Sequence, residues 1–179
     1  MRITALALGL WIIAALAGAA PLTGSFASID GGEYRLEDWR GRPVLVVNTA
    51  SRCAFTEQYD DLQALHDRYR DRGLVVLAVP SNDFRQELES EAAVKEFCEV
   101  NFALDLPMTE ITPVTGADAH PFYARVREVA GFAPRWNFNK ILIGPDGEVV
   151  ATWGSMVRPT SAAIVGRIEA LLGGSQAGG

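Results

Sequence analysis

Runs of apolar residues divide the chain into a series of predicted strands and helices. Short runs rich in Val, Leu and Ile predict buried strands, whereas apolar residues spaced three and four apart predict amphipathic helices. The predicted strands are residues 26–30, 33–36, 44–48, 74–79, 107–111, 139–143 and 148–153. The predicted helices are residues 56–72, 90–100, 121–130 and 159–172. Strands and helices therefore alternate in the middle of the chain, which ends with two strands and a helix.

Two turn motifs and one crossover predict how neighbouring strands pair. Glycines at 31–32 and the Gly-Pro-Asp-Gly turn at 144–147 each predict an antiparallel hairpin. The strand–helix–strand order within 44–79 predicts a parallel pair joined by a right-handed crossover. We therefore predict a thioredoxin-like α/β fold, with a central mixed sheet flanked by helices and an N-terminal β-hairpin. In this arrangement the reactive cysteine follows the first central strand, which is where Cys53 falls.

The N-terminus differs from the rest of the chain. A basic start is followed by an apolar stretch that ends in small residues, which predicts a secretory signal peptide over residues 1–20. An uncleaved membrane anchor is the alternative, because the stretch approaches the roughly 18–20 residues that span a bilayer. No cysteine follows it, so a lipoprotein is excluded. We expect an exported, periplasmic protein with one domain over 24–172 and a flexible tail over 173–179.

Composition narrows the function classes. The chain has 179 residues, of which 49% are hydrophobic and 21% charged, as expected for one globular domain. Its formal net charge of −6 argues against nucleic acid as a partner, because no surface would neutralise phosphates. Neither His66 nor His120 belongs to a motif of metal ligands. The acidic run over 87–91 predicts a polar loop and helix start.

The two cysteines lie in unlike settings. Cys53 follows a buried strand and a polar turn, at the mouth of the helix predicted to begin near Thr56. Unpaired N–H groups and the helix dipole favour thiolate there, so we expect its pKa below the usual value of about 8.5. Cys98 lies inside the next predicted helix. One cysteine looks like a nucleophile and the other like its partner, which predicts redox chemistry.

Three separated motifs resemble those of the glutathione peroxidase family. Residues 48–56 resemble Asn-Val-Ala-Ser-x-(Cys or selenocysteine)-Gly-x-Thr, residues 80–87 resemble Pro-Cys-Asn-Gln-Phe-Gly-x-Gln-Glu, and residues 136–140 resemble Trp-Asn-Phe-Thr-Lys. In the first motif Ala54 replaces the family's usual Gly. The second motif is one residue shorter before Gln86, which leaves open whether Gln86 or Arg85 faces the site.

The resemblance implies a peroxidase site built from Cys53, Gln86, Trp136 and Asn137. A thiolate that attacks a peroxide needs donors for the sulfur anion and the leaving oxygen, and indole and amide N–H groups are donors of this kind. The resemblance also implies that Cys98 is a resolving cysteine, which attacks the sulfenic acid formed on the first one. A buried helix cysteine without function is the alternative for Cys98.

The resemblance further implies that the enzyme acts in the response to oxidative stress without a metal or organic cofactor. Its substrates would be hydrogen peroxide and organic hydroperoxides, and its cosubstrate a thiol. The family label implies glutathione, whereas Cys98 and the lack of a long insertion before Trp136 imply a thioredoxin-like reductant and a small monomer.

Two other function classes stay open. An exported thiol–disulfide oxidoreductase of the same fold would carry Cys-x-x-Cys, but here the fourth position is Thr56. A non-catalytic binding module would have no need for Gln86, Trp136 and Asn137 together.

Overall fold

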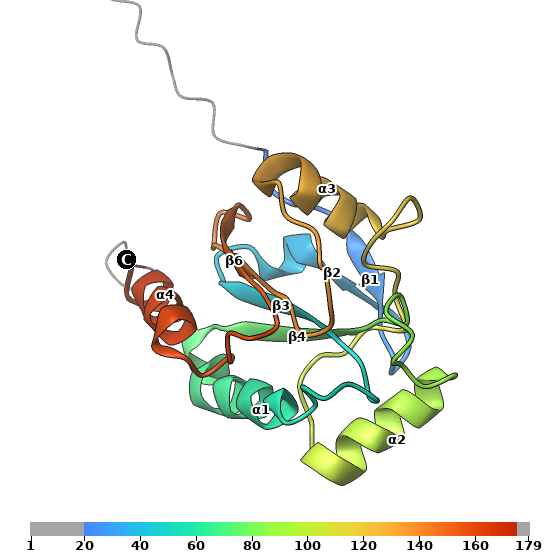
Figure 1. The fold of residues 1–179 in the computed structure, drawn as a ribbon. Helices are drawn as coiled ribbons and strands as arrows, with labels where there is room; N and C mark the ends of the chain where they lie inside the picture. The colour runs from blue at the N-terminus through green and yellow to red at the C-terminus, as the bar shows by residue number, and fades with distance from the viewer. Residues whose placement is uncertain (1–19, 175–179) are drawn as a thin grey trace, which may run out of the picture.

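The computed structural model describes residues 20–174, and its centre is a four-stranded mixed sheet (Figure 1). The strand order is β4-β3-β5-β6, with β3 parallel to β4 and the other neighbours antiparallel. The strands are β3 (Val44–Thr49), β4 (Val75–Pro80), β5 (Lys140–Ile143) and β6 (Val149–Trp153). The predicted thioredoxin-like fold is thereby confirmed.

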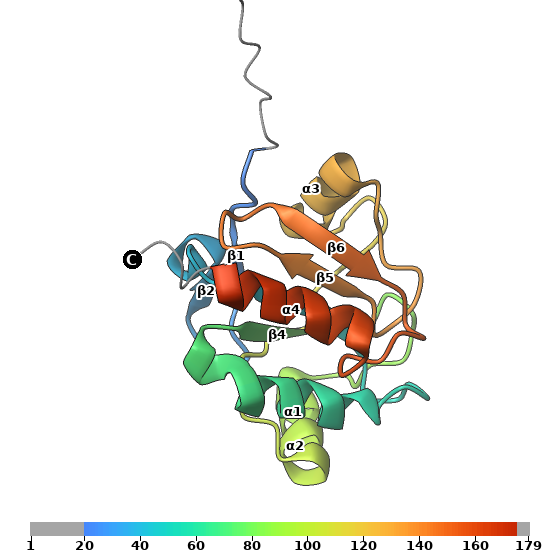
Figure 2. The ribbon, with the colours of Figure 1, turned by 90° about the vertical axis from the view of Figure 1, so that its left-hand side faces the viewer.

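The helices lie on both faces of this sheet (Figure 2). They are α1 (Gln58–Tyr69), α2 (Glu91–Phe102), α3 (Pro121–Ala130) and α4 (Ala162–Gly174), with short 3-10 turns η1 (Leu36–Trp39) and η2 (Arg70–Arg72). Among the residues described, none of these helices is long and apolar enough to cross a bilayer.

The side chains of the central strands point alternately to the two faces of the sheet, and each face has its own apolar core. Leu45 and Val47 of β3 pack into the core that α1, α2 and α4 share. Val44 and Val46 point to the opposite face, where α3 and the N-terminal segment cover them. Because successive side chains of a strand point to opposite faces, an unbroken apolar run marks a strand that is covered on both sides. All six residues of β3 are buried accordingly.

The N-terminal hairpin also forms as predicted. β1 (Ser25–Ala27) pairs antiparallel with β2 (Glu33–Arg35), and the glycines of the connecting turn have positive φ. The predicted signal peptide over 1–20 falls almost wholly outside the described residues. At the other end α4 continues to Gly174, and the remainder of the expected tail lies outside the described part.

One predicted strand, residues 107–111, is wrong. Met108 makes an isolated parallel bridge to Ala78, and the next residue, Thr109, bridges to Ser28 of the N-terminal segment. Consecutive residues thus pair with different partners, so no ladder develops. Pro107 also lacks the N–H that a ladder requires.

Candidate active site

Cys53 lies in a series of turns that follows β3. Its side chain is only 4% exposed and belongs to the core beneath α1. The helix predicted from Thr56 begins at Gln58, and the N–H of Thr56 donates to the carbonyl of Cys53 at 3.2 Å. Cys53 therefore precedes α1 by these turns instead of occupying its first turn.

The loop that carries Gln86 is bonded to the backbone immediately before Cys53. The N–H of Arg52 donates to the carbonyl of Gln86 at 2.8 Å. One residue earlier, the N–H of Ser51 donates to Oε1 of Glu87 at 3.0 Å. Two successive residues of the Cys53 turn are thus held by two successive residues of the Gln86 loop.

Glu87 is a site component that sequence reasoning missed. The acidic run predicted a polar loop, but this side chain is 3% exposed and its Oε1 also accepts from the N–H of Leu88 at 2.8 Å. Burial raises the pKa of Glu87, while the hydrogen bonds from Ser51 and Leu88 act in the opposite direction. A buried carboxylate that accepts backbone N–H groups is a structural tie between two loops. Its place directly after Gln86 in the motif was the available signal.

The amides of Gln86 and Asn137 are in direct contact. Nδ2 of Asn137 donates to Oε1 of Gln86 at 2.9 Å, with Asn137 fully buried and Gln86 half-buried. Arg85 is exposed and has a φ of 58°, in the left-handed region. In the shortened loop, Gln86 therefore contacts Asn137, whereas Arg85 lies at the surface.

Asn48 of β3 holds the segment that carries Trp136 and Asn137. Its Nδ2 donates to the carbonyl of Trp136 at 2.9 Å, and its Oδ1 accepts from the N–H of Asn139 at 3.0 Å. Its carbonyl accepts from the N–H of Phe138, which has a φ of 58°. A bulky residue with positive φ is uncommon and persists where the surroundings determine the backbone conformation. The segment over 136–139 is therefore tightly fixed.

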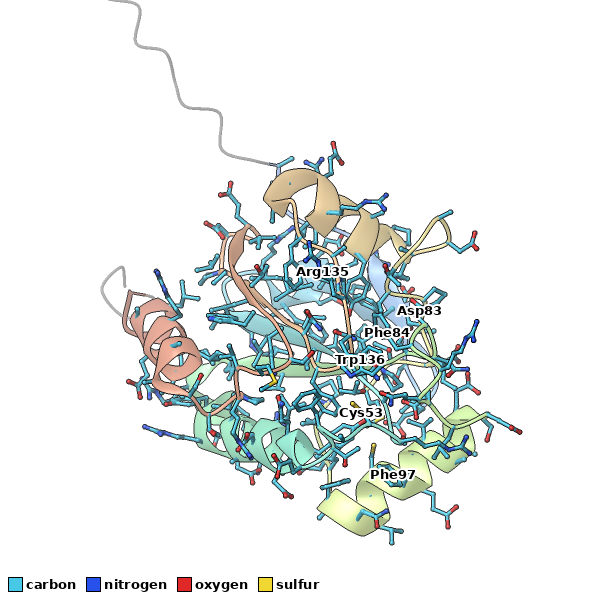
Figure 3. All side chains as sticks on the ribbon, in the orientation of Figure 1. Cys53, Asp83, Phe84, Phe97, Arg135 and Trp136 are labelled. Carbon is cyan, nitrogen blue, oxygen red and sulfur yellow. The ribbon has the colours of Figure 1, made fainter. Side chains whose placement is uncertain are left out.

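Trp136 lies at the surface of this cluster. Its side chain is 41% exposed, and its ring packs against Phe84 with centroids 5.5 Å apart. In the view of Figure 3, Trp136 is drawn between Phe84 and Cys53. Within residues 20–174 no hydrogen bond joins the Cys53 sulfur to Gln86, Trp136 or Asn137. Gln86 and Asn137 thus meet directly, whereas Cys53 is connected to them through the backbone.

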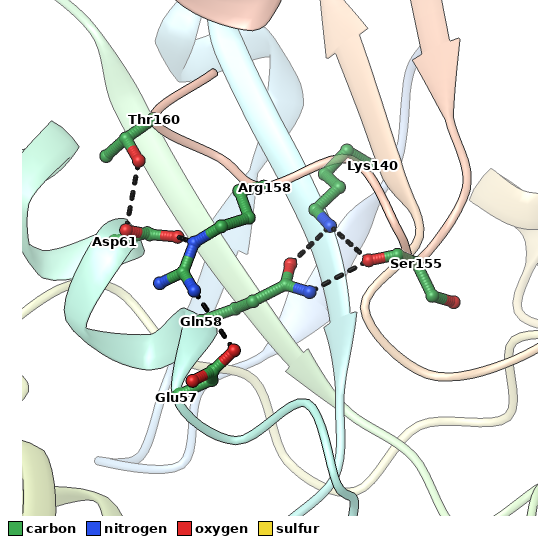
Figure 4. A network of polar contacts seen from close by, with 7 residues as sticks. All are labelled: Glu57, Gln58, Asp61, Lys140, Ser155, Arg158 and Thr160. Carbon is green, nitrogen blue, oxygen red and sulfur yellow. Dashed lines mark hydrogen bonds and ion pairs between the residues drawn. The ribbon is translucent and has the colours of Figure 1, made fainter.

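A buried polar network joins Gln58, Lys140 and Ser155 (Figure 4). Nζ of Lys140 donates to Oε1 of Gln58 at 2.5 Å, and both side chains donate to the carbonyl of Ser155. The hydroxyl of Ser155 donates in turn to the carbonyl of Asn137 at 2.6 Å. Burial lowers the pKa of Lys140 to about 7. The network ties the start of α1 to the segment that holds Asn137.

Arg158 makes a second set of contacts beside this network, at the surface. Its guanidinium donates to Asp61 at 2.7 Å and to Glu57 at 3.0 Å, and the hydroxyl of Thr160 donates to Asp61 at 3.0 Å (Figure 4). The turn after β6 is therefore fixed to the first turn of α1.

Cys98 is a buried thiol on α2, and both cysteines are free. Burial raises the pKa of Cys98 to about 12, and the nearby carboxylates of Glu87 and Glu99 also raise it. Only Val94 and Cys98 of α2 are buried, and Val100 is 76% exposed. The thiol is thus protonated and enclosed, on a helix that packs through Val94 and Cys98 together with the partly buried Phe97 and Phe102.

Comparisons with known proteins agree with this architecture. The family model described as Glutathione peroxidase matches residues 23–127. Glutathione peroxidase-like peroxiredoxin GPX5 of Chlamydomonas reinhardtii is 39% identical over 144 residues, covering 78% of this chain and 89% of that protein. Hydroperoxy fatty acid reductase gpx1 of Synechocystis is 38% identical over 156 residues, covering 81% of this chain and 91% of that protein.

A solved structure extends the likeness to three dimensions. The crystal structure of Trgpx in its apo form matches with a TM-score of 0.66 at 30% identity, covering 84% of this chain and 93% of that one. The sequence motifs, the fold and the relatives agree. The chain therefore belongs to the glutathione peroxidase family and is a peroxidase of that kind.

Proposed function

We propose that this chain reduces hydrogen peroxide and small organic hydroperoxides at Cys53, with donors from Gln86, Trp136 and Asn137. The observation that carries the proposal is the contact between the Gln86 and Asn137 amides, together with the backbone bond from Arg52 to Gln86. Through these bonds Gln86 and Asn137 are joined to Arg52, the residue before Cys53. A thiol–disulfide oxidoreductase or a binding module would have no use for this arrangement.

In the first step the Cys53 thiolate attacks one oxygen of the peroxide. A sulfur–oxygen bond forms while the oxygen–oxygen bond breaks, and its electron pair goes to the leaving oxygen. That oxygen takes up a proton and departs as water or an alcohol, so the peroxide is reduced and Cys53 is oxidised to a sulfenic acid. Fixed N–H donors act on the charge that develops at the leaving oxygen.

In the second step Cys98 resolves the sulfenic acid. Its sulfur attacks the sulfur of Cys53, a disulfide forms, and the hydroxyl leaves as water. A thiol reductant then supplies two electrons and two protons and restores both thiols. Because burial raises the pKa of Cys98 to about 12, this step requires α2 to open locally. Exposure gives the thiol an ordinary pKa and brings it to Cys53.

A dithiol protein of the thioredoxin kind is the reductant that this chemistry favours, with glutathione as the alternative. The apolar stretch at the N-terminus supports export to the periplasm, where an enzyme of this kind would act against oxidative stress as a monomer.

Peroxide consumption with glutathione and with a thioredoxin system, measured side by side, tests the proposal. Cys53→Ser should abolish turnover with either reductant, because an alcohol is too weakly acidic to serve as the nucleophile. Gln86→Ala should lower kcat by about 10²-fold, as for the loss of one fixed donor. Gln63→Ala removes a half-buried amide of α1 that bonds to Asp67 and Asp105 and to no site residue, so it is the matched control and should retain activity.

Cys98→Ser separates the two steps. After one equivalent of peroxide this variant should accumulate sulfenic acid on Cys53, visible by mass, and lose thioredoxin-driven turnover. Full activity of the Cys53 variant would overturn the proposal as a whole. Undiminished thioredoxin-driven cycling of the Cys98 variant would overturn only the resolving role.

A further inference from the structure

Lys140 is a buried amine that the proposed reaction does not use. Its side chain is fully buried at the start of β5, next to the segment that carries Trp136 and Asn137. Within residues 20–174 it forms no ion pair, whereas the other lysine of the chain, Lys95, pairs with Asp30. A cation in the interior is costly unless it is paired or well hydrogen-bonded. Buried titratable groups of this kind gather at functional sites, so Lys140 is a candidate for a role in the reaction.

Hydrogen bonds connect the amine of Lys140 to the donors of the candidate active site. Nζ donates to Oε1 of Gln58, which orients this amide so that its Nε2 donates to the carbonyl of Ser155 at 2.8 Å (Figure 4). The hydroxyl of Ser155 donates to the carbonyl of Asn137 at 2.6 Å. Nδ2 of Asn137 donates in turn to Oε1 of Gln86 at 2.9 Å. A continuous series of hydrogen bonds therefore leads from Lys140 to the amide pair of the site.

The charged groups near Nζ come from α1 and from the turn after β6. Burial lowers the pKa of Lys140 to about 7, Asp61 raises it and Arg158 lowers it. Asp61 and Glu57 both accept from the guanidinium of Arg158, so neither carboxylate neutralises Nζ directly. The strands β3 and β6, which flank β5, carry no charged residue. Lys140 therefore exchanges its proton near neutral pH.

The two protonation states differ in how strongly they bind their acceptors. The ammonium makes charge-assisted hydrogen bonds to Gln58 and to the carbonyl of Ser155, which are roughly twice as strong as those of a neutral amine. Loss of the proton therefore weakens the first bonds of the series without changing the residues that form it.

We propose that Lys140 is a positioning residue for the peroxidase reaction, which acts through Gln58 and Ser155 to hold Asn137 and its partner Gln86 in place. The ammonium form holds this amide pair more firmly than the neutral amine does. Donors act on a leaving oxygen most effectively when they are fixed beforehand, and small displacements of such groups are costly. The inference rests on the function proposed above and adds to its first step a residue and a pH dependence.

The test follows the first step alone, in a Cys98→Ser background that serves as the parent. The rate of sulfenic acid formation on Cys53 with hydrogen peroxide is measured by quenching and mass, from about pH 6 to 9. Lys140→Met keeps an unbranched side chain of similar length but removes the amine. At pH 6 its rate should be about tenfold below that of the parent. The ratio of the two rates cancels the pH dependence that they share, and it should fall several-fold as pH rises through about 7.

Two variants that change charge but not size test the same point independently of how well Lys140→Met folds. Gln58→Glu places a carboxylate beside Nζ and favours the ammonium, so its rate relative to the parent should rise several-fold between about pH 7 and 9. Asp61→Asn removes the carboxylate that raises the pKa of Lys140, so its relative rate should fall between about pH 6 and 7. Lys95→Met, on α2, is the matched control and should keep the rate and the pH profile of the parent.

The outcomes are separable. Equal rates of Lys140→Met and the parent at pH 6 would overturn the positioning role. A loss of rate that is the same at every pH, with pH profiles of Gln58→Glu and Asp61→Asn parallel to that of the parent, would also overturn it, since packing alone would then explain the loss. Both results would leave the peroxidase proposal intact. Failure of the parent to form sulfenic acid on Cys53 with hydrogen peroxide would instead overturn the underlying function.

Discussion

The segment over 136–139 and helix α2 differ in how firmly they are held, although each carries part of the proposed chemistry. In the first, Asn137, Phe138 and Asn139 are all buried, and hydrogen bonds from Asn48 and Ser155 hold the backbone. In α2 only Val94 and Cys98 are buried, Phe97 and Phe102 pack against the core while partly exposed, and Lys95 pairs with Asp30 at the surface.

This difference matches two different physical requirements. Donors that stabilise a leaving oxygen act best when they are fixed before the reaction, because reorganisation would consume the stabilisation that they give. A resolving thiol has the opposite requirement, since it must leave its enclosed position to reach its partner. Segments with few buried apolar contacts open at low free energy. The fold thus combines a rigid donor segment with a loosely attached thiol.

The largest expected effect on turnover comes from loosening the rigid segment. Asn48→Ala removes a donor to the Trp136 carbonyl and an acceptor for the N–H of Asn139. The Trp136 carbonyl keeps its bond from Nδ2 of Asn139 at 2.6 Å, so the buried N–H of Asn139 is the group left without a partner. The free energy of unfolding should therefore fall by about 1–3 kcal/mol. We expect peroxide turnover to fall by about 10²-fold, because the Asn137 amide is no longer held in place. Urea unfolding and steady-state kinetics measure the two effects.

Asn101→Ala is the matched control in α2. Asn101 is exposed, and its Nδ2 donates to the carbonyl of Phe97 within the same helix. Replacing it by the best helix former should change stability by less than about 0.5 kcal/mol. Equal losses in the two variants would contradict the contrast between a rigid and a loose region.

A smaller effect tests the loose region directly, through alkylation of Cys98 in a Cys53→Ser background. Glu96 is exposed in the middle of α2, and Glu96→Gly should cost about 1 kcal/mol of helix stability relative to Glu96→Ala. If the thiol reacts only when α2 opens, its alkylation rate should rise about fivefold. Ala64→Gly, at an exposed residue of α1, should cost about the same helix stability but leave the alkylation rate of Cys98 unchanged.

The pH dependence of the same rate tests the enclosure of Cys98. The folded pKa, about 12, lies above the ordinary value, so burial of the protonated thiol stabilises α2 at low pH. This stabilisation is complete below the ordinary value and is lost as pH rises through about 8.5 toward the folded value. We expect the alkylation rate to rise about tenfold per pH unit between pH 7 and 10. A plateau near pH 8.5 would mean that the thiol is already exposed.

The elements with clear end signals could be predicted from the sequence. Helix α3 has the predicted bounds because His120 caps it, Pro121 starts it and Gly131 ends it with a left-handed residue. The strand predicted over 107–111 does not form, because its apolar run meets two different partners. Periodicity reports that a segment is covered, but not by which neighbour. That choice is made by tertiary structure.

Within the site, the motifs predicted the residue types but not the bonds between them. The sequence named Gln86 and Asn137 as donors, but their mutual hydrogen bond depends on the left-handed backbone at Arg85 and Phe138. Glu87 looked like part of a solvated acidic run, and only the fold buries it. A polar Asn48 at the end of an apolar strand was a visible signal of a buried tie.

The smallest expected effect is that of Arg85→Gly, at one of two residues that share a φ of 58°; the other is Phe138. Arg85 is exposed, so Arg85→Gly removes the cost of a side chain in the left-handed region without loss of buried area. Glycine also makes the unfolded chain more flexible, which offsets part of the gain. We therefore expect a net increase of up to about 0.5 kcal/mol in the free energy of unfolding.

Phe138 is fully buried, so Phe138→Gly should instead lower the free energy of unfolding by about 3–5 kcal/mol. Arg52→Gly is the control, because Arg52 is exposed and does not have a positive φ; this change should be slightly destabilising. Urea unfolding measures the free energy of unfolding of the three variants and so ranks their stabilities. A loss of stability in Arg85→Gly comparable to that of Arg52→Gly would mean that the Gln86 loop is relaxed rather than strained.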